Sequence, residues 1–148
     1  MLIYLTGRDL VLSVPEAYSK HNIYRDAASL SRNVLQNEAT EIICQDFLCC
    51  FNWKDLPKII DLILSKMRKG CKLTIIEKDL RLISRQVYKD LYNTELLNKK
   101  VFEFGQIVKS LFSLEDIIGH ITDTDQYIVT SKGFIDATSF SLIVERVR

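Results

Sequence analysis

The chain has 148 residues, of which 47% are hydrophobic and 26% are charged, a composition typical of a globular domain. With 20 basic and 19 acidic residues, the formal net charge is only +1. Electrostatics therefore does not indicate nucleic acid or an anionic membrane as a partner. We expect one domain, residues 1–148, built around a single hydrophobic core.

The cysteines indicate neither a metal site nor a disulfide scaffold. Cys44, Cys49, Cys50 and Cys71 contain no C-x-x-C pair, and only two histidines are available to help. A chain of this length does not need disulfides, so free thiols in a reducing compartment are expected. No apolar run approaches the ~20 residues that span a bilayer. We expect a soluble, cytoplasmic protein without a bound metal, possibly part of a larger assembly.

The first 40 residues contain short strand-like runs and no long helical pattern. Met1–Leu5 is predicted to be a buried strand, and Thr6–Asp9 is predicted to be the turn that follows it. The remaining candidates are strands at Leu10–Val14 and Asn22–Tyr24 and a short helix at Ala27–Leu35.

Residues 41–77 give the clearest pattern, which predicts a strand, an amphipathic helix and a second strand. Glu41–Asp46 is a short apolar run with a polar end, as in a buried parallel strand. Apolar residues then recur at helical spacing between positions 56 and 67, and Gly70 is the expected residue after the helix. Lys72–Glu77 is the second strand. Two parallel strands joined by a helix form a βαβ unit.

The last third of the chain predicts helices followed by a strand pair. Two helices are expected at 80–92 and 97–111, and Ser113 with Asp116 forms a capping-box pattern before a third. The predicted strands of the tail are Tyr127–Ile135 and Phe140–Val144. A late antiparallel pair suits the edge of a parallel sheet. The predicted fold class is α/β, doubly wound, with a mostly parallel sheet and a C-terminal antiparallel strand pair.

The entry to the second predicted strand carries a partial signature. Gly70 and Leu73 match the Leu-x-Pro-Gly-Gly-x-Leu pattern before strand five of class I S-adenosylmethionine-dependent methyltransferases, whereas Lys69 and Cys71 replace its proline and second glycine. Residues 24–148 resemble that family. The resemblance implies a Rossmann-like methyltransferase fold and, in an active member, S-adenosylmethionine as the methyl donor.

The part that would hold the donor departs from the family. The family binds the donor at a G-x-G-x-G turn after strand one, where glycines let the backbone approach the ligand. Here Thr6–Asp9 offers one glycine, Gly7, with a charged residue directly after it. Three strands of about 5 residues and two crossovers of at least ~12 would use all of the chain before Glu41. We therefore expect an abbreviated N-terminal half that has lost one or both helices.

Three residues would form a divergent donor site if one is retained: Gly7, Asp26 and Gln45. Gly7 lies in the shortened turn, and Asp26 with Ala27 resembles the family's Asp-Ala pair that contacts the adenine amino group. Gln45 and the adjacent Asp46 end a parallel strand, where open α/β sheets bind ligands. Each also has an ordinary interpretation as a turn glycine, a helix cap or a solvated strand end.

The other polar candidates do not indicate a catalytic site. Glu77 and Asp79 flank the end of the second strand and are expected in a solvated turn. His21 and His120 lack a partner pattern for nucleophilic catalysis, and Trp53 is expected to be a packing anchor at a helix start. No catalytic residue and no metal ligand is predicted.

These observations favour a degenerate methyltransferase-fold domain that binds no cofactor and acts as a protein-binding or structural subunit. Lost helices would uncover an apolar sheet face near Met1–Leu12, which another protein chain would bury. The alternative is an active small methyltransferase that uses Gly7, Asp26 and Gln45 to bind S-adenosylmethionine. A third possibility is an enzyme or nucleotide binder of another α/β family. Fold alone does not decide among these functions.

Overall fold

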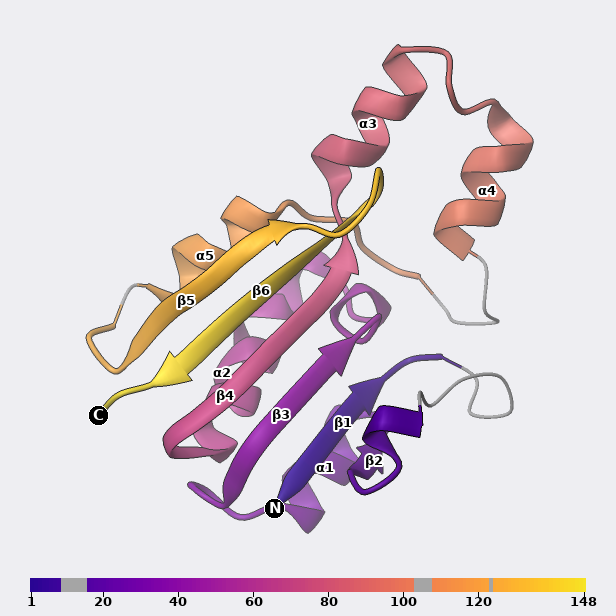
Figure 1. Cartoon of the computed structure of the whole chain (residues 1–148). Helices are drawn as coiled ribbons and strands as arrows, with labels where there is room; N and C mark the ends of the chain where they lie inside the picture. The colour runs from indigo at the N-terminus through magenta and orange to yellow at the C-terminus, as the bar shows by residue number, and fades with distance from the viewer. Residues whose placement is uncertain (9–15, 103–107, 123) are drawn as a thin grey trace.

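The computed structural model describes residues 1–8, 16–102, 108–122 and 124–148. One six-stranded sheet forms its centre, with the strand order β2-β1-β3-β4-β6-β5 (Figure 1). β1 to β4 run parallel, and β6 and β5 close the sheet as an antiparallel pair. The strands are β1 Leu2–Thr6, β2 Asn22–Tyr24, β3 Ala39–Gln45, β4 Met67–Lys78, β5 Tyr127–Phe134 and β6 Ser139–Arg146.

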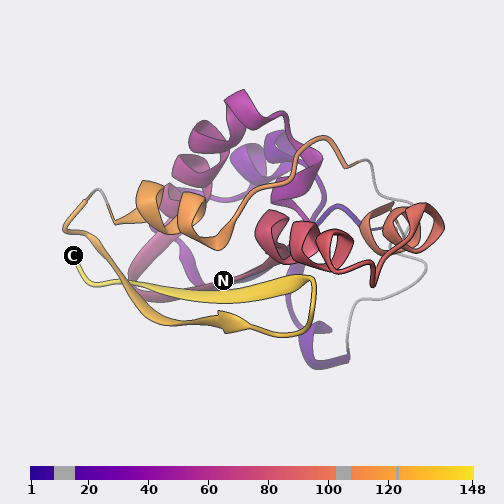
Figure 2. The ribbon, with the colours of Figure 1, turned by 90° about the horizontal axis from the view of Figure 1, so that it is seen from above.

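The helices are distributed unevenly about the sheet. They are α1 Ala27–Asn33, α2 Leu56–Lys66, α3 Leu80–Tyr88, α4 Thr94–Phe102 and α5 Leu114–Ile121, with short 3-10 turns η1 Glu16–Tyr18, η2 Leu48–Cys50 and η3 Trp53–Asp55. α1, α2 and α5 cover one face, while α3 and α4 project beyond the end of β4 (Figures 1 and 2). Among the described residues, no helix is long and apolar enough to cross a membrane.

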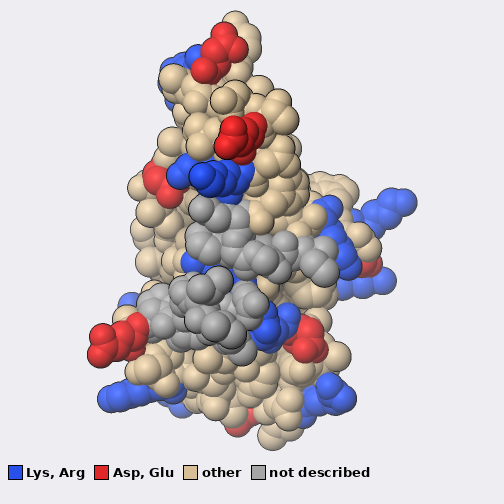
Figure 3. Space-filling model, turned by 90° about the vertical axis from the view of Figure 1, so that its right-hand side faces the viewer, with Lys and Arg blue, Asp and Glu red and all other residues tan. Residues whose placement is uncertain are grey.

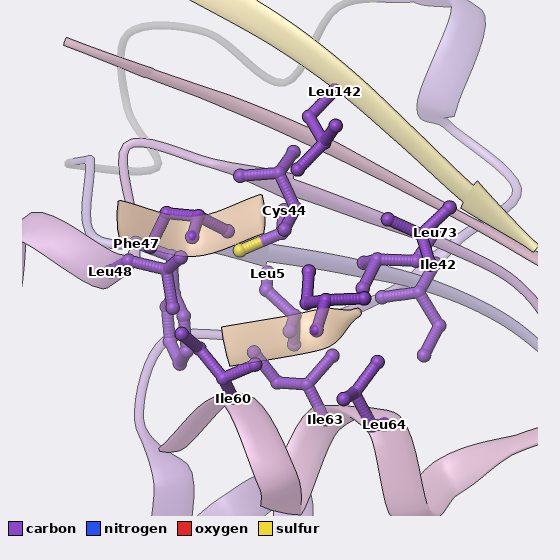
Figure 4. Close-up of a cluster of buried hydrophobic side chains, with 14 of the residues drawn as sticks. Leu5, Ile42, Cys44, Phe47, Leu48, Ile60, Ile63, Leu64, Leu73 and Leu142 are labelled. Carbon is purple, nitrogen blue, oxygen red and sulfur yellow. The ribbon is translucent and has the colours of Figure 1, made fainter. Parts of the chain in front are cut away.

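The core lies between the sheet and the helices α1, α2 and α5 (Figure 4). Ile42 and Cys44 of β3 pair in register with Leu73 and Ile75 of β4, and all four side chains are buried on this face. α2 contributes Leu56, Ile60, Ile63 and Leu64 to the same core. Each fully buried aliphatic side chain contributes about 1.5–3 kcal/mol, so this interface is a main source of stability.

The opposite face of the sheet is called the open face here. Side chains alternate between the two faces along a strand, so this face carries the residues between the core positions. Its middle row is Tyr4, Ile43, Thr74 and Ile143, which are in register across four strands. In the described part of the chain, η1 lies over β1 on this side, and its Tyr18 ring stacks on Tyr4 with ring centroids 5.3 Å apart.

The predicted strand–helix–strand of the central segment is confirmed, except at the end of its helix. α2 ends at Lys66, because Met67 already pairs with Ala39 of β3. Gly70 has the expected left-handed backbone, with φ 79, but it lies inside β4 rather than directly after the helix. The pairing of β3 with β4 shifts register at this point.

The expected abbreviation of the N-terminal half is confirmed. Between β1 and β2, the described residues form η1 rather than a helix comparable to α2. The strand candidate Leu10–Val14 falls outside the described residues. Asn22–Tyr24 is a strand as predicted, and the weak helical pattern after it forms α1, which ends at Asn33.

The C-terminal half follows the prediction except around α3 and α4. The expected helix through residue 111 is wrong at its end, since residues 108–111 are not helical and Lys109 donates its backbone N–H to the Cys49 carbonyl; residues 103–107 lie outside the described residues. In α3 only Ile83 is buried, because this helix projects past the sheet. The capping box at Ser113 and the antiparallel strand pair are confirmed.

Candidate functional site

The carboxyl ends of β1, β3 and β4 meet at one edge of the sheet. Thr6, Gln45 and Ile76 are in register across these strands. From β1 the chain leads outward to β2, whereas β3 lies on the other side of β1. Open α/β sheets bind ligands at such a point, outside the carboxyl ends of the strands where the chain changes direction. We therefore take this edge as the candidate site.

Gly7 and the segment after β3 close the gap between β1 and β3. The Gly7 N–H donates to the Asp46 carbonyl at 3.0 Å, and the Cys50 thiol also reaches this carbonyl, at 3.7 Å. A Cβ atom added at Gly7 would lie 2.2 Å from Cys50 Sγ and 2.9 Å from the Asp46 carbonyl oxygen. A glycine is therefore required at this position by close contact with the protein itself.

A partly buried ion pair spans the same gap. Arg8 forms an ion pair with Asp46. Asp46 is only 4% exposed, and its backbone φ angle is 48°. A left-handed backbone is uncommon for aspartate and turns the chain sharply at the end of β3. Arg25 donates to the Arg8 carbonyl at 2.6 Å, which ties the end of β1 to the segment after β2. The backbone and side chains at the gap are thus engaged with one another.

Glu77 is buried beneath this edge, so the prediction that it lies in a solvated turn is wrong. Its side chain is fully buried, and Oε1 accepts the backbone N–H groups of Phe47 at 2.8 Å and Leu48 at 2.7 Å. Among the described residues Oε2 has no hydrogen-bond partner. Burial raises the pKa of Glu77 well above its usual value, and the negative charge of Asp46 acts in the same direction. Glu77 therefore holds η2 in place.

Asp79 is likewise buried and links two helices, contrary to the expected solvated turn. It is 1% exposed; Oδ1 accepts the Leu82 N–H and Oδ2 accepts the Leu114 N–H, both at 2.9 Å. Its carboxylate thus caps α3 and anchors the start of α5. Sequence reasoning missed the burial of both acids because Phe47, Leu48 and Leu114 lie far from them in the chain. The cap of α3 is local, and an aspartate just before a helical pattern could have indicated it.

The two adjacent cysteines lie on η2 beside Gly7. Cys49 is buried, whereas Cys50 is half-buried. A hydrogen bond from Cys49 lowers the pKa of the Cys50 thiol, and the charges of Lys109 and Arg25 act in the same direction. Cys49 is therefore a small buried core residue, whereas Cys50 is only partly buried.

The three predicted donor-site residues follow neighbouring strands but already have partners within the fold. Asp26 is the N-cap of α1 and accepts from the Ser29 N–H at 2.7 Å, which lowers the pKa of its carboxyl. Gln45 accepts a hydrogen bond from the Tyr4 hydroxyl at 3.0 Å. Gly7 is in contact with Asp46, as described above. Gly7 and Gln45 lie close together, and Asp26 lies one strand further out, after β2.

A cavity of about 520 Å³ opens at the same edge, on the side of the open face. The ends of β3 and β4 form its floor, and Tyr92, Lys100 and the turn between β5 and β6 form its walls. Lys and Arg side chains gather around the middle of the molecule on the side shown in Figure 3. The cavity is a second feature of the edge, beside the closed gap between β1 and β3.

The remaining polar candidates lie away from this edge or form simple pairs. His120 pairs with Asp61 at 2.8 Å, and His21 pairs with Glu41 at 3.1 Å. Trp53 is 55% exposed, so its interpretation as a packing anchor is wrong. Within the described ranges, no group of three or more His, Cys, Asp or Glu side chains could hold a metal ion.

Solved structures that are similar to this chain include methyltransferases that depend on S-adenosylmethionine. One such enzyme from Methanosarcina mazei is similar with a TM-score of 0.60 and 14% identity, over 86% of this chain and 66% of that chain. An O-methyltransferase family 2 protein from Planctomyces limnophilus, in complex with apigenin, has a TM-score of 0.58 and 16% identity, over 99% of this chain and 43% of that chain. A protein from Pyrococcus horikoshii OT3 has a TM-score of 0.62 and 10% identity, over 99% of this chain and 72% of that chain.

The chain therefore has the Rossmann-like fold of class I methyltransferases, as its sequence predicted. It spans less than two thirds of the length of the Methanosarcina and Planctomyces enzymes. No family model and no curated protein matches the sequence. At these identities the similarity establishes the fold, and activity must be argued from the site.

Proposed function

We propose that this chain is a methyltransferase-fold domain that does not bind the methyl donor and instead binds another protein chain. The observation that supports this most strongly is the closed gap between β1 and β3. A donor-binding turn must expose backbone N–H groups to the ligand. Here the Gly7 N–H is bonded to Asp46, and Cys50 Sγ occupies the space above Gly7.

A donor molecule would have to displace several interactions to enter this gap. It would break the Gly7–Asp46 hydrogen bond and separate the Arg8–Asp46 ion pair. Breaking a buried ion pair leaves an uncompensated charge in a poorly solvated position, which costs about 3–5 kcal/mol. The contacts of Asp46 therefore favour a permanently closed gap over an induced opening.

The proposed partner site is the part of the open face over β4 and β6. Tyr4 and Ile43 are already buried on this face, whereas Ile76 and Ile143 are half-buried. A doubly wound fold covers both faces of its sheet with helices, but the described β1–β2 crossover supplies only η1. We propose that an amphipathic helix of the partner packs over Ile76 and Ile143.

Charges beside these isoleucines would orient such a helix. Glu41, Lys72 and Glu145 are neighbours in register across β3, β4 and β6, at the amino end of the open face. A complementary row on a partner would set its direction, because charge pairs at the rim of an interface contribute more to specificity than to affinity. In the predicted site near Met1–Leu12, the Tyr4 ring is buried beneath Tyr18 of η1, so we place the proposed site over β4 and β6 instead.

Donor binding tests the first half of the proposal. Thermal unfolding is followed with increasing S-adenosylmethionine and S-adenosylhomocysteine, up to millimolar concentration. We expect no change in the melting temperature. A ligand present at 100 times its dissociation constant stabilises a protein by about 2.7 kcal/mol, so a bound donor would be readily detected. A saturable rise would support the alternative, an active methyltransferase using Gly7, Asp26 and Gln45.

Affinity purification from cells of the native source tests the second half. The tagged wild-type chain is compared with Ile143→Asp, which places a charge on the proposed interface, and with Lys132→Asp, an exposed position on β5. We expect a stoichiometric partner with the wild type and the control variant, and its loss with Ile143→Asp. Recovery of the same partner with all three folded proteins would refute this interface.

A further inference from the structure

The cavity at the carboxyl edge has chemical features that protein binding on the open face does not use. It measures about 520 Å³, within the range of small-molecule sites. Its lining comes from four separate parts of the chain: the ends of the parallel strands, the α3–α4 connection, α4 itself and the β5–β6 turn. Such convergence is typical of a site that encloses a small ligand.

The two carboxylates in the cavity are already engaged. Asp46 pairs with Arg8. Asp136 Oδ1 accepts the backbone N–H groups of Thr138 at 2.8 Å and Ser139 at 2.9 Å, so this acid shapes the turn between β5 and β6. Burial opposes ionisation of Asp136, but these hydrogen bonds outweigh it and lower the pKa of the carboxyl. The nearby charge of Lys78 contributes to the same shift.

Two ammonium groups are left without a directly bonded partner. Lys78 lines the cavity from the end of β4, and Lys100 lines it from α4 on another wall. In the described part of the chain, neither of these two ammonium groups forms a hydrogen bond or an ion pair. Together with Arg8, they give the lining three cations against two anions. The remaining charge of the cavity therefore favours an anion.

Apolar and aromatic groups complete the lining. Ile76 lies on the floor, and Ile135 and Ala137 belong to the β5–β6 turn, while Tyr92 comes from the α3–α4 connection. A bare inorganic ion would leave these surfaces without a partner. A ligand with an apolar or aromatic body and one anionic group would contact both parts of the lining.

We propose that this cavity binds a small organic phosphate. The phosphate group lies between Lys78 and Lys100, and the body of the ligand packs against Tyr92 and Ile135. Phosphate oxygens accept several charge-assisted hydrogen bonds, which suits two ammonium donors on different walls. The cavity shares Arg8 and Asp46 with the closed gap between β1 and β3, but the phosphate group would contact Lys78 and Lys100, which lie outside that gap.

Phenyl phosphate is a suitable probe because it joins the two features. Binding is measured by calorimetry on the full chain with phenyl phosphate, inorganic phosphate and phenol, at low ionic strength. We expect phenyl phosphate to bind more tightly than either fragment. Lys78→Gln and Lys100→Gln should each weaken its binding by about tenfold, since each removes a hydrogen bond to a charged group.

Matched lysines provide the controls. Lys69→Gln changes an exposed lysine on the same strand as Lys78, and Lys99→Gln changes the neighbour of Lys100 on α4; neither lines the cavity. Both controls should keep wild-type affinity. The proposal is overturned if folded wild-type protein does not bind phenyl phosphate at millimolar concentration. It is equally overturned if the control lysines matter as much as Lys78 and Lys100.

Discussion

The two halves of the carboxyl edge differ in how they use the same sheet. Between β1 and β3, Gly7, Asp46 and Cys50 fill the gap where the fold would receive a ligand. Beside β4 and β6, the edge opens into a cavity lined by Lys78 and Lys100, whose ammonium groups form no ion pair within the described part of the chain. The central strands and α2 keep their full packing under both halves. A fold can therefore keep its framework while the contacts at its edge change from ligand binding to internal packing.

The largest expected effect is a loss of stability when Asp79, the buried acid directly after β4, is replaced. Asp79→Ala removes the acceptor of two backbone N–H groups, those of Leu82 and Leu114. Each lost hydrogen bond to a charged group contributes about 1.5–3 kcal/mol, so we expect a loss of about 3–6 kcal/mol. Urea denaturation measures this change.

The exposed residue Asp125 provides the comparison for Asp79. It forms a surface ion pair with Arg148, so Asp125→Ala should change stability by less than about 1 kcal/mol. Similar losses in both variants would show that Asp79 does not anchor α3 and α5.

The closed gap between β1 and β3 is tested by adding a single methyl group at Gly7. Gly7→Ala places a Cβ 2.2 Å from Cys50 Sγ and 2.9 Å from the Asp46 carbonyl oxygen. Overpacking of this kind costs about 1–3 kcal/mol. Combining Gly7→Ala with Cys50→Ala removes the closer contact and should restore part of the stability.

Gly119→Ala is the matched control for Gly7→Ala. A Cβ at Gly119 meets no atom within 4 Å, and the residue lies in α5. Alanine is favoured over glycine in a helix by about 0.8–1 kcal/mol, so this variant should be slightly more stable than the wild type. If Gly7→Ala were also neutral, the gap between β1 and β3 would be wider than described.

A smaller effect on the free energy of unfolding, which depends on pH, is expected at Glu77. The fold raises the pKa of this carboxyl above its usual value of 4.5. Above pH 4.5 the folded state therefore retains a proton that the unfolded state releases. Stability should fall as pH rises from that value toward the raised pKa, by at most about 1.4 kcal/mol per pH unit. Glu77→Gln should remove this slope.

Glu145→Gln, a change on the open face of β6, serves as the control for Glu77→Gln. It should leave the pH dependence of the free energy of unfolding as in the wild type. A wild-type profile that is flat between pH 5 and pH 8 would mean that Glu77 is accommodated as an anion.

Local patterns in the sequence predicted the framework of the fold well. The helical spacing before Met67 and the apolar run before Asp46 depend on neighbouring residues, and both elements were found. Chain length before Glu41 predicted the abbreviated first half. Gly7 was singled out as a residue of a possible donor site, but its contact with Cys50 lies across the fold and was not visible in the sequence.

Long-range contacts explain what the sequence did not predict. Glu77 and Asp79 are buried because η2 and the start of α5 donate backbone N–H groups to them. α4 ends before Val108 in part because the segment after it bonds to the Cys49 carbonyl. In each case the partner lies far away in the chain, so neither hydrophobic period nor turn preference carries the signal.

The Gly7 amide reports most directly on the claim that the gap between β1 and β3 is closed to the methyl donor. In ¹⁵N-labelled protein, its resonance is followed while S-adenosylhomocysteine is titrated to millimolar concentration. The account predicts an unchanged Gly7 resonance and slow hydrogen exchange, because this N–H is bonded to the Asp46 carbonyl. A saturable shift of Gly7 would contradict it and would establish donor binding at the first strand.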